Sequence, residues 1–115
     1  MSEIGRRRLE QITVAVAAAR LAIADGDLEF LLRCAPASEL SAAEIASRLR
    51  SAQVGRTELP PFPAPDVNTS PLDALGDRWL TRFPLWSDGQ PIDVVVTMTV
   101  EFPGDSRPMF GIVRS

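Results

Sequence analysis

The feature that most constrains this chain is the run from Ile92 to Phe102, in which apolar and polar residues alternate. Successive side chains of a β-strand point to opposite faces of a sheet, so this run predicts a long strand with one buried face. Residues 79–85 alternate in the same way, and short turn signals occupy 87–91 and 103–108. Such short connections join antiparallel neighbours. We therefore expect a meander of three to four antiparallel strands over residues 78–114.

The first part of the chain has a helical period instead. Its main apolar stripe recurs every three or four residues and predicts a helix over residues 3–24, which Asp25-Gly26 ends. The stripe consists of Leu9, Ile12, Val16, Ala19 and Ile23. A second, weaker stripe on the same helix consists of Val14, Ala18 and Leu21. The main stripe is expected to pack on the sheet.

Two shorter helices are expected within a helical layer that covers residues 3–54. Asp27 is placed to cap a second helix. Ser41 and Glu44 have the spacing of a capping box, and Gly55 is expected to end the third helix. Helices first and strands last define an α+β fold, with three helices packed on a small antiparallel sheet. The length of 115 residues suggests a single domain over 1–115.

The connection over residues 56–71 is rich in proline, which has no backbone N–H donor, so neither a helix nor a central strand is expected there. Leu59 and Phe62 within it indicate that it is held across the domain. The sequence leaves open whether a fourth strand lies near 56–60. Ser70-Pro71-Leu72-Asp73 has the form of a helix start and predicts one helical turn.

Composition argues against several functions. The net charge is −3 and the pI is about 4.9, whereas a nucleic-acid binder needs a basic face. The chain contains no His, Lys or Tyr, so the usual acids and bases of catalysis at neutral pH are missing and an enzyme is the less favoured class. One Cys without His does not make a zinc site. We therefore expect no catalytic residues, no metal and no other cofactor.

The N-terminal region imitates a signal peptide, with arginines at 6–8 before an apolar stretch at 13–19. Glu10, Gln11 and Arg20 interrupt that pattern, so an amphipathic helix in a cytoplasmic protein is expected, with export as the alternative. The arginines are read as a solvated face rather than an anion-binding patch. No stretch approaches the roughly 20 apolar residues that a membrane span needs, so no membrane association is expected.

Two stretches resemble known families. AIADGDLEFLLRC, at residues 22–34, resembles the opening of nuclear-transport-factor-2-like (cystatin-type) domains. In those domains a long helix and a second helix pack on a curved antiparallel sheet shaped like a cone. GRTELPP, followed by Trp79-x-x-x-x-Pro84-Leu85-Trp86 and the alternating strand, resembles a family of small actinobacterial domains of unknown function. The first resemblance implies a cone-like α+β domain with an apolar pocket, and the second implies no activity.

Trp86 is the main candidate for a binding residue, and two placements are open for it. If the strand continues to alternate past Pro84, Trp86 falls on the face opposite the core and is exposed. An exposed Trp with Arg82 and Asp88 nearby has the composition of a protein-interface anchor. Alternatively, Pro84 breaks the alternation and turns Trp86 onto the sheet edge or under the proline-rich connection.

A cone-like domain would carry its pocket on the inner face of the sheet. The expected lining is Trp79, Phe83, Val94, Val96, Met98 and Phe110. Cys34 lies at the end of the second helix with no His to activate it, so a buried, inert thiol is expected. Asp93 is expected to pair with Arg82 across two strands.

Three functions are consistent with these observations, in order of preference. The first is a non-catalytic bacterial binding module for a protein partner, with an immunity, accessory or regulatory role. The second is a small-ligand-binding or enzymatic domain that uses the apolar pocket. The third is a structural subunit that forms a homodimer through its sheet or a sheet edge.

Overall fold

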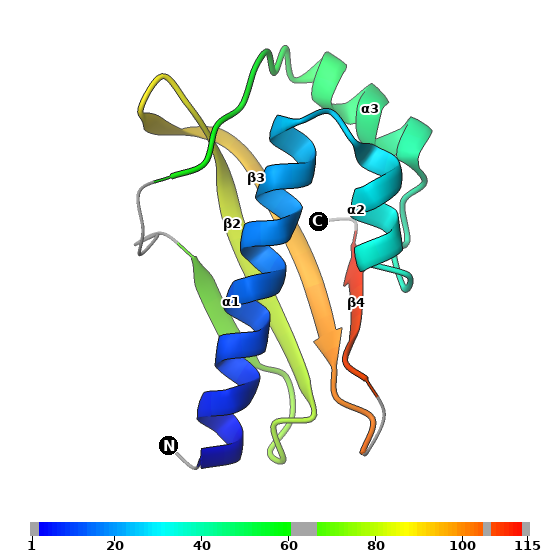
Figure 1. Cartoon of the computed structure of the whole chain (residues 1–115), viewed down its shortest axis with the longest axis vertical. Helices are drawn as coiled ribbons and strands as arrows, with labels where there is room; N and C mark the ends of the chain where they lie inside the picture. Colours follow the sequence, from blue (N-terminus) through cyan, green and yellow to red (C-terminus); the bar gives the residue numbers. More distant parts are fainter. Residues whose placement is uncertain (1–2, 61–66, 105–106, 114–115) are drawn as a thin grey trace.

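The computed structural model describes residues 3–60, 67–104 and 107–113, and it places three helices before a four-stranded sheet. The helices are α1 (Glu3–Ala24), α2 (Leu28–Cys34) and α3 (Ala42–Ser51). The strands are β1 (Asn68–Pro71), β2 (Arg78–Ser87), β3 (Gln90–Glu101) and β4 (Met109–Ile112). They pair antiparallel in the order β1-β2-β3-β4 (Figure 1). The α+β architecture and the meander expected from the sequence are therefore confirmed.

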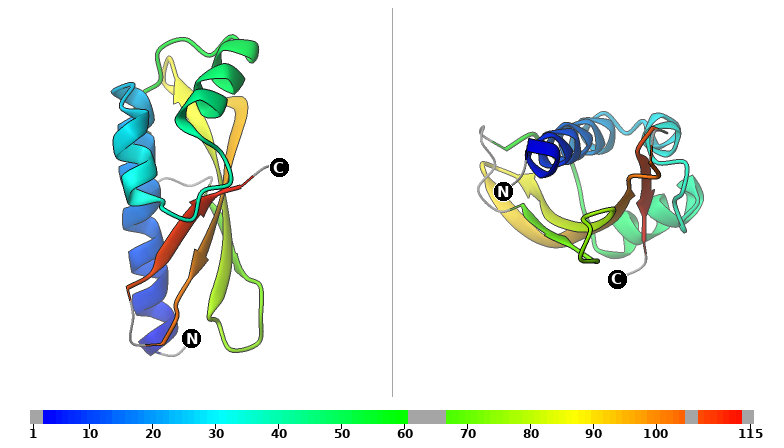
Figure 2. Two further views of the ribbon diagram at one scale, coloured as in Figure 1. Left: turned by 90° about the vertical axis from the view of Figure 1, so that its right-hand side faces the viewer. Right: turned by 90° about the horizontal axis from the view of Figure 1, so that it is seen from below.

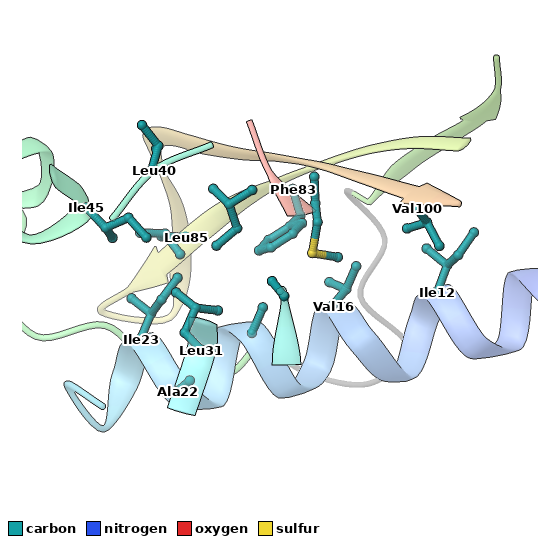
Figure 3. Packing of buried hydrophobic residues seen from close by; sticks show 14 of the residues in the cluster. Ile12, Val16, Ala22, Ile23, Leu31, Leu40, Ile45, Phe83, Leu85 and Val100 are labelled. Carbon is teal, nitrogen blue, oxygen red and sulfur yellow. The ribbon is translucent and has the colours of Figure 1, made fainter. Parts of the chain in front are cut away.

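The main apolar stripe of α1 is the buried one. The sheet is curved, and α1 runs along one of its faces (Figure 2). From the helix, Ile12 and Val16 point toward the sheet and are 1% and 3% exposed (Figure 3). From the strands, Phe83 and Val100 meet them and are fully buried. Burying large apolar side chains on both sides contributes roughly 1.5–3 kcal/mol for each, which ties α1 to the strands that follow it by more than fifty residues.

The helix ends follow the predicted capping residues. Gly26 takes the left-handed conformation after α1, with a φ of 71°. The carboxylate of Asp27 accepts the backbone N–H of Phe30 at 3.1 Å and so caps α2. At the start of α3, the N–H of Glu44 donates to Oγ of Ser41 at 3.2 Å, and the capping box is complete.

The end of α3 differs from the prediction. The helix ends at Ser51, four residues before Gly55. Gln53 takes the left-handed conformation there, with a φ of 56°, and the N–H of Val54 donates to the carbonyl of Leu49 at 2.9 Å. This is the Schellman arrangement, and it satisfies the last carbonyls of the helix without a glycine. The position of Gly55 therefore misplaced the end of the helix.

The helical turn predicted at residues 70–73 is wrong, because these residues end strand β1 and begin a turn. Thr69 pairs with Thr81 of β2, and their hydroxyl oxygens lie 2.9 Å apart. Proline has no backbone N–H donor. Pro71 is tolerated because β1 lies at the edge of the sheet, where outward-facing backbone groups need no partner strand. In the following turn, the carboxylate of Asp73 accepts the N–H of Asp77 at 2.9 Å.

Candidate functional site

Trp86 is buried, with 8% of its surface exposed, so its interpretation as an exposed interface anchor is wrong. Burial alternates along β2 as far as Leu85, which belongs to the core beneath the helices. The pairing of β2 with β3 shifts between Pro84 and Trp86, so strict alternation stops there, and Trp86 lies outside the core cluster that contains Leu85. The chain before β1 runs beside Trp86, with the N–H of Glu58 donating to the carbonyl of Trp86 at 2.9 Å, in agreement with the alternative placement at the sheet edge beside the proline-rich connection.

The first residues of the proline-rich connection are thus held to the sheet, as expected, and the contacts that hold them there are made by residues 56 and 58. The hydroxyl of Ser87 donates to the carbonyl of Arg56 at 3.0 Å, and the N–H of Gly89 donates to the carboxylate of Glu58. Leu59 is 50% exposed and contributes little to holding the connection in place. Phe62 lies outside the described residues. Near 56–60 the sheet gains only an isolated bridge at Glu58 rather than a strand.

Arg82 and Asp88 do not form a cluster with Trp86. Arg82 is exposed on the outer face of β2, and four residues of strand separate it from Trp86 by about 13 Å. Asp88 and Gly89 form the two-residue turn between β2 and β3, with φ values of 54° and 78°. Two positive φ values in a two-residue hairpin loop define a type I′ turn, so the position of Asp88 is explained by the turn.

The expected pair between Asp93 and Arg82 is also wrong. The register places Thr97 opposite Arg82. Closer to the hairpin, the pairing shifts between Pro84 and Trp86, so that β3 carries two more residues than β2 over this stretch. The bulge includes Asp93 and moves it along the strand away from Arg82.

The residues expected to line an inner pocket form packed core instead. Trp79, Phe83 and Met98 are 8%, 0% and 2% exposed and belong to the core cluster. Phe83 and Met98 border no space large enough for water and offer no wall to a ligand. Trp79 borders a separate open pocket of about 200 Å³, lined by the first turns of α1 and the turn after β1. Val94 and Val96 border a small cavity of about 80 Å³ near α3.

Phe110, the last of the expected pocket residues, lies instead beside α1. It borders an open groove of about 490 Å³ together with Val14, Ala15 and Ala18 of α1 and Cys34 of α2. These five residues define what we call the α1 groove. Its walls come from three elements that the fold brings side by side: the second apolar stripe of α1, the end of α2 and strand β4 (Figure 1).

The α1 groove exposes apolar side chains to an unusual degree. Val14 is 69% exposed, and Leu21 on the same stripe is 45% exposed. The prediction of a buried Cys34 is wrong, because the thiol is exposed. Leu31 is the one buried residue of α2, so this short helix turns most of its surface, Cys34 included, away from the core. Arg7 and Glu10 supply charge at the rim of the groove.

Two arginines of α1 have structural roles that the sequence did not reveal. Arg8 donates to the carbonyl of Gly76 at 2.6 Å and to the carboxylate of Asp77 at 3.0 Å, and its guanidinium lies 4.9 Å from the ring centre of Phe102. It is therefore not part of a solvated face, and only Arg6 and Arg7 of the run are exposed.

Arg20 is 3% exposed, donates to the carbonyl of Pro84 at 2.8 Å and lies 5.1 Å from the ring centre of Phe83. Such a contact joins a hydrogen bond to a cation–π interaction. Its spacing from Val16 and Ile23 places it on the main stripe, which is the one signal that could have predicted its burial.

Within the described ranges, no group of three or more His, Cys, Asp or Glu side chains is arranged to hold a metal ion. Among the same residues, no helix is both long enough and apolar enough to cross a membrane. Comparison with known proteins finds no matching family model, no matching curated protein and no matching solved structure. Function is therefore inferred from the geometry and chemistry of the chain itself.

Proposed function

We propose that this protein is a non-catalytic binding module that docks a protein partner in the α1 groove. The observation that carries the proposal is the exposure of Val14 and Leu21 on a helix whose other apolar stripe is already buried in the core. Val14 adjoins further apolar residues that line the groove, namely Ala15, Ala18, Pro108 and Phe110. Contiguous apolar surface is stabilised when a partner covers it, and it commonly marks an interaction site. An accessory, regulatory or immunity role in a bacterial cytoplasm is the setting we expect.

The shape of the groove favours a helical segment of a protein as the partner. The groove runs beside a long helix and is open on its outer side, so a second helix can lie along it with its apolar side chains inserted. Ala15 and Ala18 are among the residues that line it, and their small side chains let another backbone approach closely. Arg7 and Glu10 at the rim are placed to select a partner by charge.

A small apolar ligand is the second candidate. The groove volume of about 490 Å³ falls within the range of small-molecule sites, and Phe110 and Cys34 add an aromatic ring and a thiol to its wall. Ligand sites usually enclose most of the ligand, however, and this groove leaves one side open. The protein partner is therefore preferred.

The test is capture of partners from host lysate with three tagged proteins: the original chain, Val14→Asp and Val95→Asp. Val95 is 50% exposed on β3, outside the groove, and serves as the matched control. We expect a near-stoichiometric partner with the original chain and with Val95→Asp, and its loss with Val14→Asp. Equal capture by all three proteins would show that the groove is not the docking surface. Capture of nothing by the original chain would refute the proposal and favour the small ligand.

A further inference from the structure

We infer that the segment that docks in the α1 groove is α1 of a second copy of this chain, so that two copies pair through antiparallel α1 helices. This inference rests on the proposed function, because it names the partner of the same groove. It is carried by three features of α1: a line of seam positions, the distribution of charge along the helix, and the small residues at the centre.

The outward face of α1 carries a line of positions with the spacing of a two-helix seam. The line consists of Ile4, Arg7, Gln11, Val14, Ala18 and Leu21, at alternating intervals of three and four. This spacing keeps one face turned toward a neighbouring helix along its whole length. Three of these positions are apolar and open to solvent: Ile4 is 65% exposed, Val14 69% and Leu21 45%.

Charge selects the antiparallel orientation. Arg7 lies on the seam line near the start of α1, where Glu3 and Glu10 offset part of the positive charge, and Asp25 continues the line just past the end of the helix; both Arg7 and Asp25 are exposed. Parallel helices would bring like charges together at both ends, and antiparallel helices bring opposite charges together. The helix dipoles act in the same direction, because antiparallel helices place the positive end of each beside the negative end of the other.

The same charges favour one register of the two α1 helices. When Arg7 of one copy faces Asp25 of the other, Val14 faces Ala18 and Gln11 faces Leu21, on both sides of a two-fold axis near Val16. Arg7 is available for this pair, because within the described parts of the chain its ion-pair partner is Glu3, at 3.8 Å, and both side chains are highly exposed. Exposed ion pairs of this kind contribute little to stability, so Asp25 of the second copy can replace Glu3 as the partner of Arg7.

The packing at the axis is compatible with close approach. Val14 of each copy enters the groove of the other and meets the small side chain of Ala18, so the helices can approach to the usual 8–10 Å between axes. In this register Gln11 faces Leu21, and placing its amide against an apolar side chain weakens the pair. We therefore expect a reversible dimer that depends on concentration.

The structure does not favour pairing of copies through the strand β4. Its outer edge already accepts hydrogen bonds from the chain before α3, with the N–H of Ala37 donating to Phe110 at 3.0 Å and that of Glu39 to Ile112 at 2.8 Å. At the other side of the sheet, β1 is short and ends in Pro71, which removes a donor. The apolar helix face is the better surface for a second copy.

Sedimentation equilibrium on the purified full chain tests the inference, over concentrations that extend into the hundreds of micromolar. We expect the original chain and Val95→Asp to form the same reversible dimer, and Val14→Asp to weaken it at least tenfold. Circular dichroism checks that each variant keeps its fold, which is expected because Val14 is mostly exposed. A dimer unaffected by Val14→Asp would overturn the inference.

A charge exchange tests orientation and register. Arg7→Asp and Asp25→Arg should each weaken the dimer several-fold, and the double variant should recover most of the original affinity. A double variant as weak as the single ones would overturn the antiparallel register.

The outcomes for self-pairing and for the proposed function can be told apart. If the original chain stays monomeric but captures another protein that Val14→Asp loses, self-pairing is wrong and the binding function stands. If it stays monomeric and captures nothing, both are wrong.

Discussion

Gly111 lies where β4 meets the chain that covers its edge, and it allows a demanding test of the packing. A Cβ built on Gly111 would overlap the carbonyl oxygen of Ala37 and lie 2.7 Å from the carbonyl carbon of that residue. Real Cβ atoms essentially never come within 3.0 Å of a heavy atom, and these atoms belong to a backbone, which cannot rotate away as a side chain can. We predict that Gly111→Ala moves the two segments apart.

The size of the effect follows from two terms. Overpacking of a tight contact costs about 1–3 kcal/mol. Separating the segments also weakens the hydrogen bonds from Ala37 to Phe110 and from Glu39 to Ile112, each worth about 0.5–1.5 kcal/mol. The bonds are strained rather than lost, so we expect Gly111→Ala to lower the free energy of unfolding by about 2–4 kcal/mol, a large part of the total for a domain of this size.

Urea unfolding followed by circular dichroism measures this difference, with Gly55→Ala as the matched control. A Cβ at Gly55 meets nothing within 4 Å, and its φ lies outside the left-handed region. The control should therefore leave stability unchanged or raise it by about 0.4–1 kcal/mol. If Gly111→Ala proves as stable as Gly55→Ala, the close approach of residue 37 to β4 is wrong, and with it the argument that this edge is covered.

Three further predictions concern single side chains. Arg8→Met should lower the free energy of unfolding, measured in urea, by about 1–2 kcal/mol because two charged hydrogen bonds are lost. The control Arg6→Met, at an exposed position, should change it by less than about 0.5 kcal/mol. Equal effects of the two substitutions would contradict the structural role of Arg8. Trp86→Ala should cost about 3 kcal/mol and speed proteolysis near residues 56–58, and an effect near zero would restore the exposed placement. Cys34 should react with one equivalent of a thiol reagent without denaturant, and a thiol that reacts only after unfolding would show that it is buried.

Local patterns predicted the elements of this fold better than its contacts. The helix of residues 3–24 and the caps at Asp27 and Ser41 were predictable because each depends on atoms within a few residues of one another. The segment at residues 70–73 was not, because its local form suits a helix start as well as a strand end. Its hydrogen bonds to β2 decide between them, and those come from another part of the chain.

The candidate site shows the same division. The second stripe of α1 was visible in the sequence, but nothing there shows which of two stripes a sheet will cover. The sequence left two placements open for Trp86, and its burial beside Glu58 depends on a pairing with a residue that lies far from it along the chain. Cys34 was wrongly predicted to be buried, because Leu31 is the one buried residue of the seven-residue helix α2.

By itself, the sequence determined the α+β order, the main buried stripe of α1 and a composition without His, Lys or Tyr. These follow from periodicity and composition, which act over short distances or over the whole chain. Only the tertiary structure decided that Trp86 is buried, that Arg8 and Arg20 face inward, and that Val14 remains exposed beside Cys34 and Phe110. Burial depends on which distant segment arrives at a given face, and that is a property of the packed chain rather than of any local stretch.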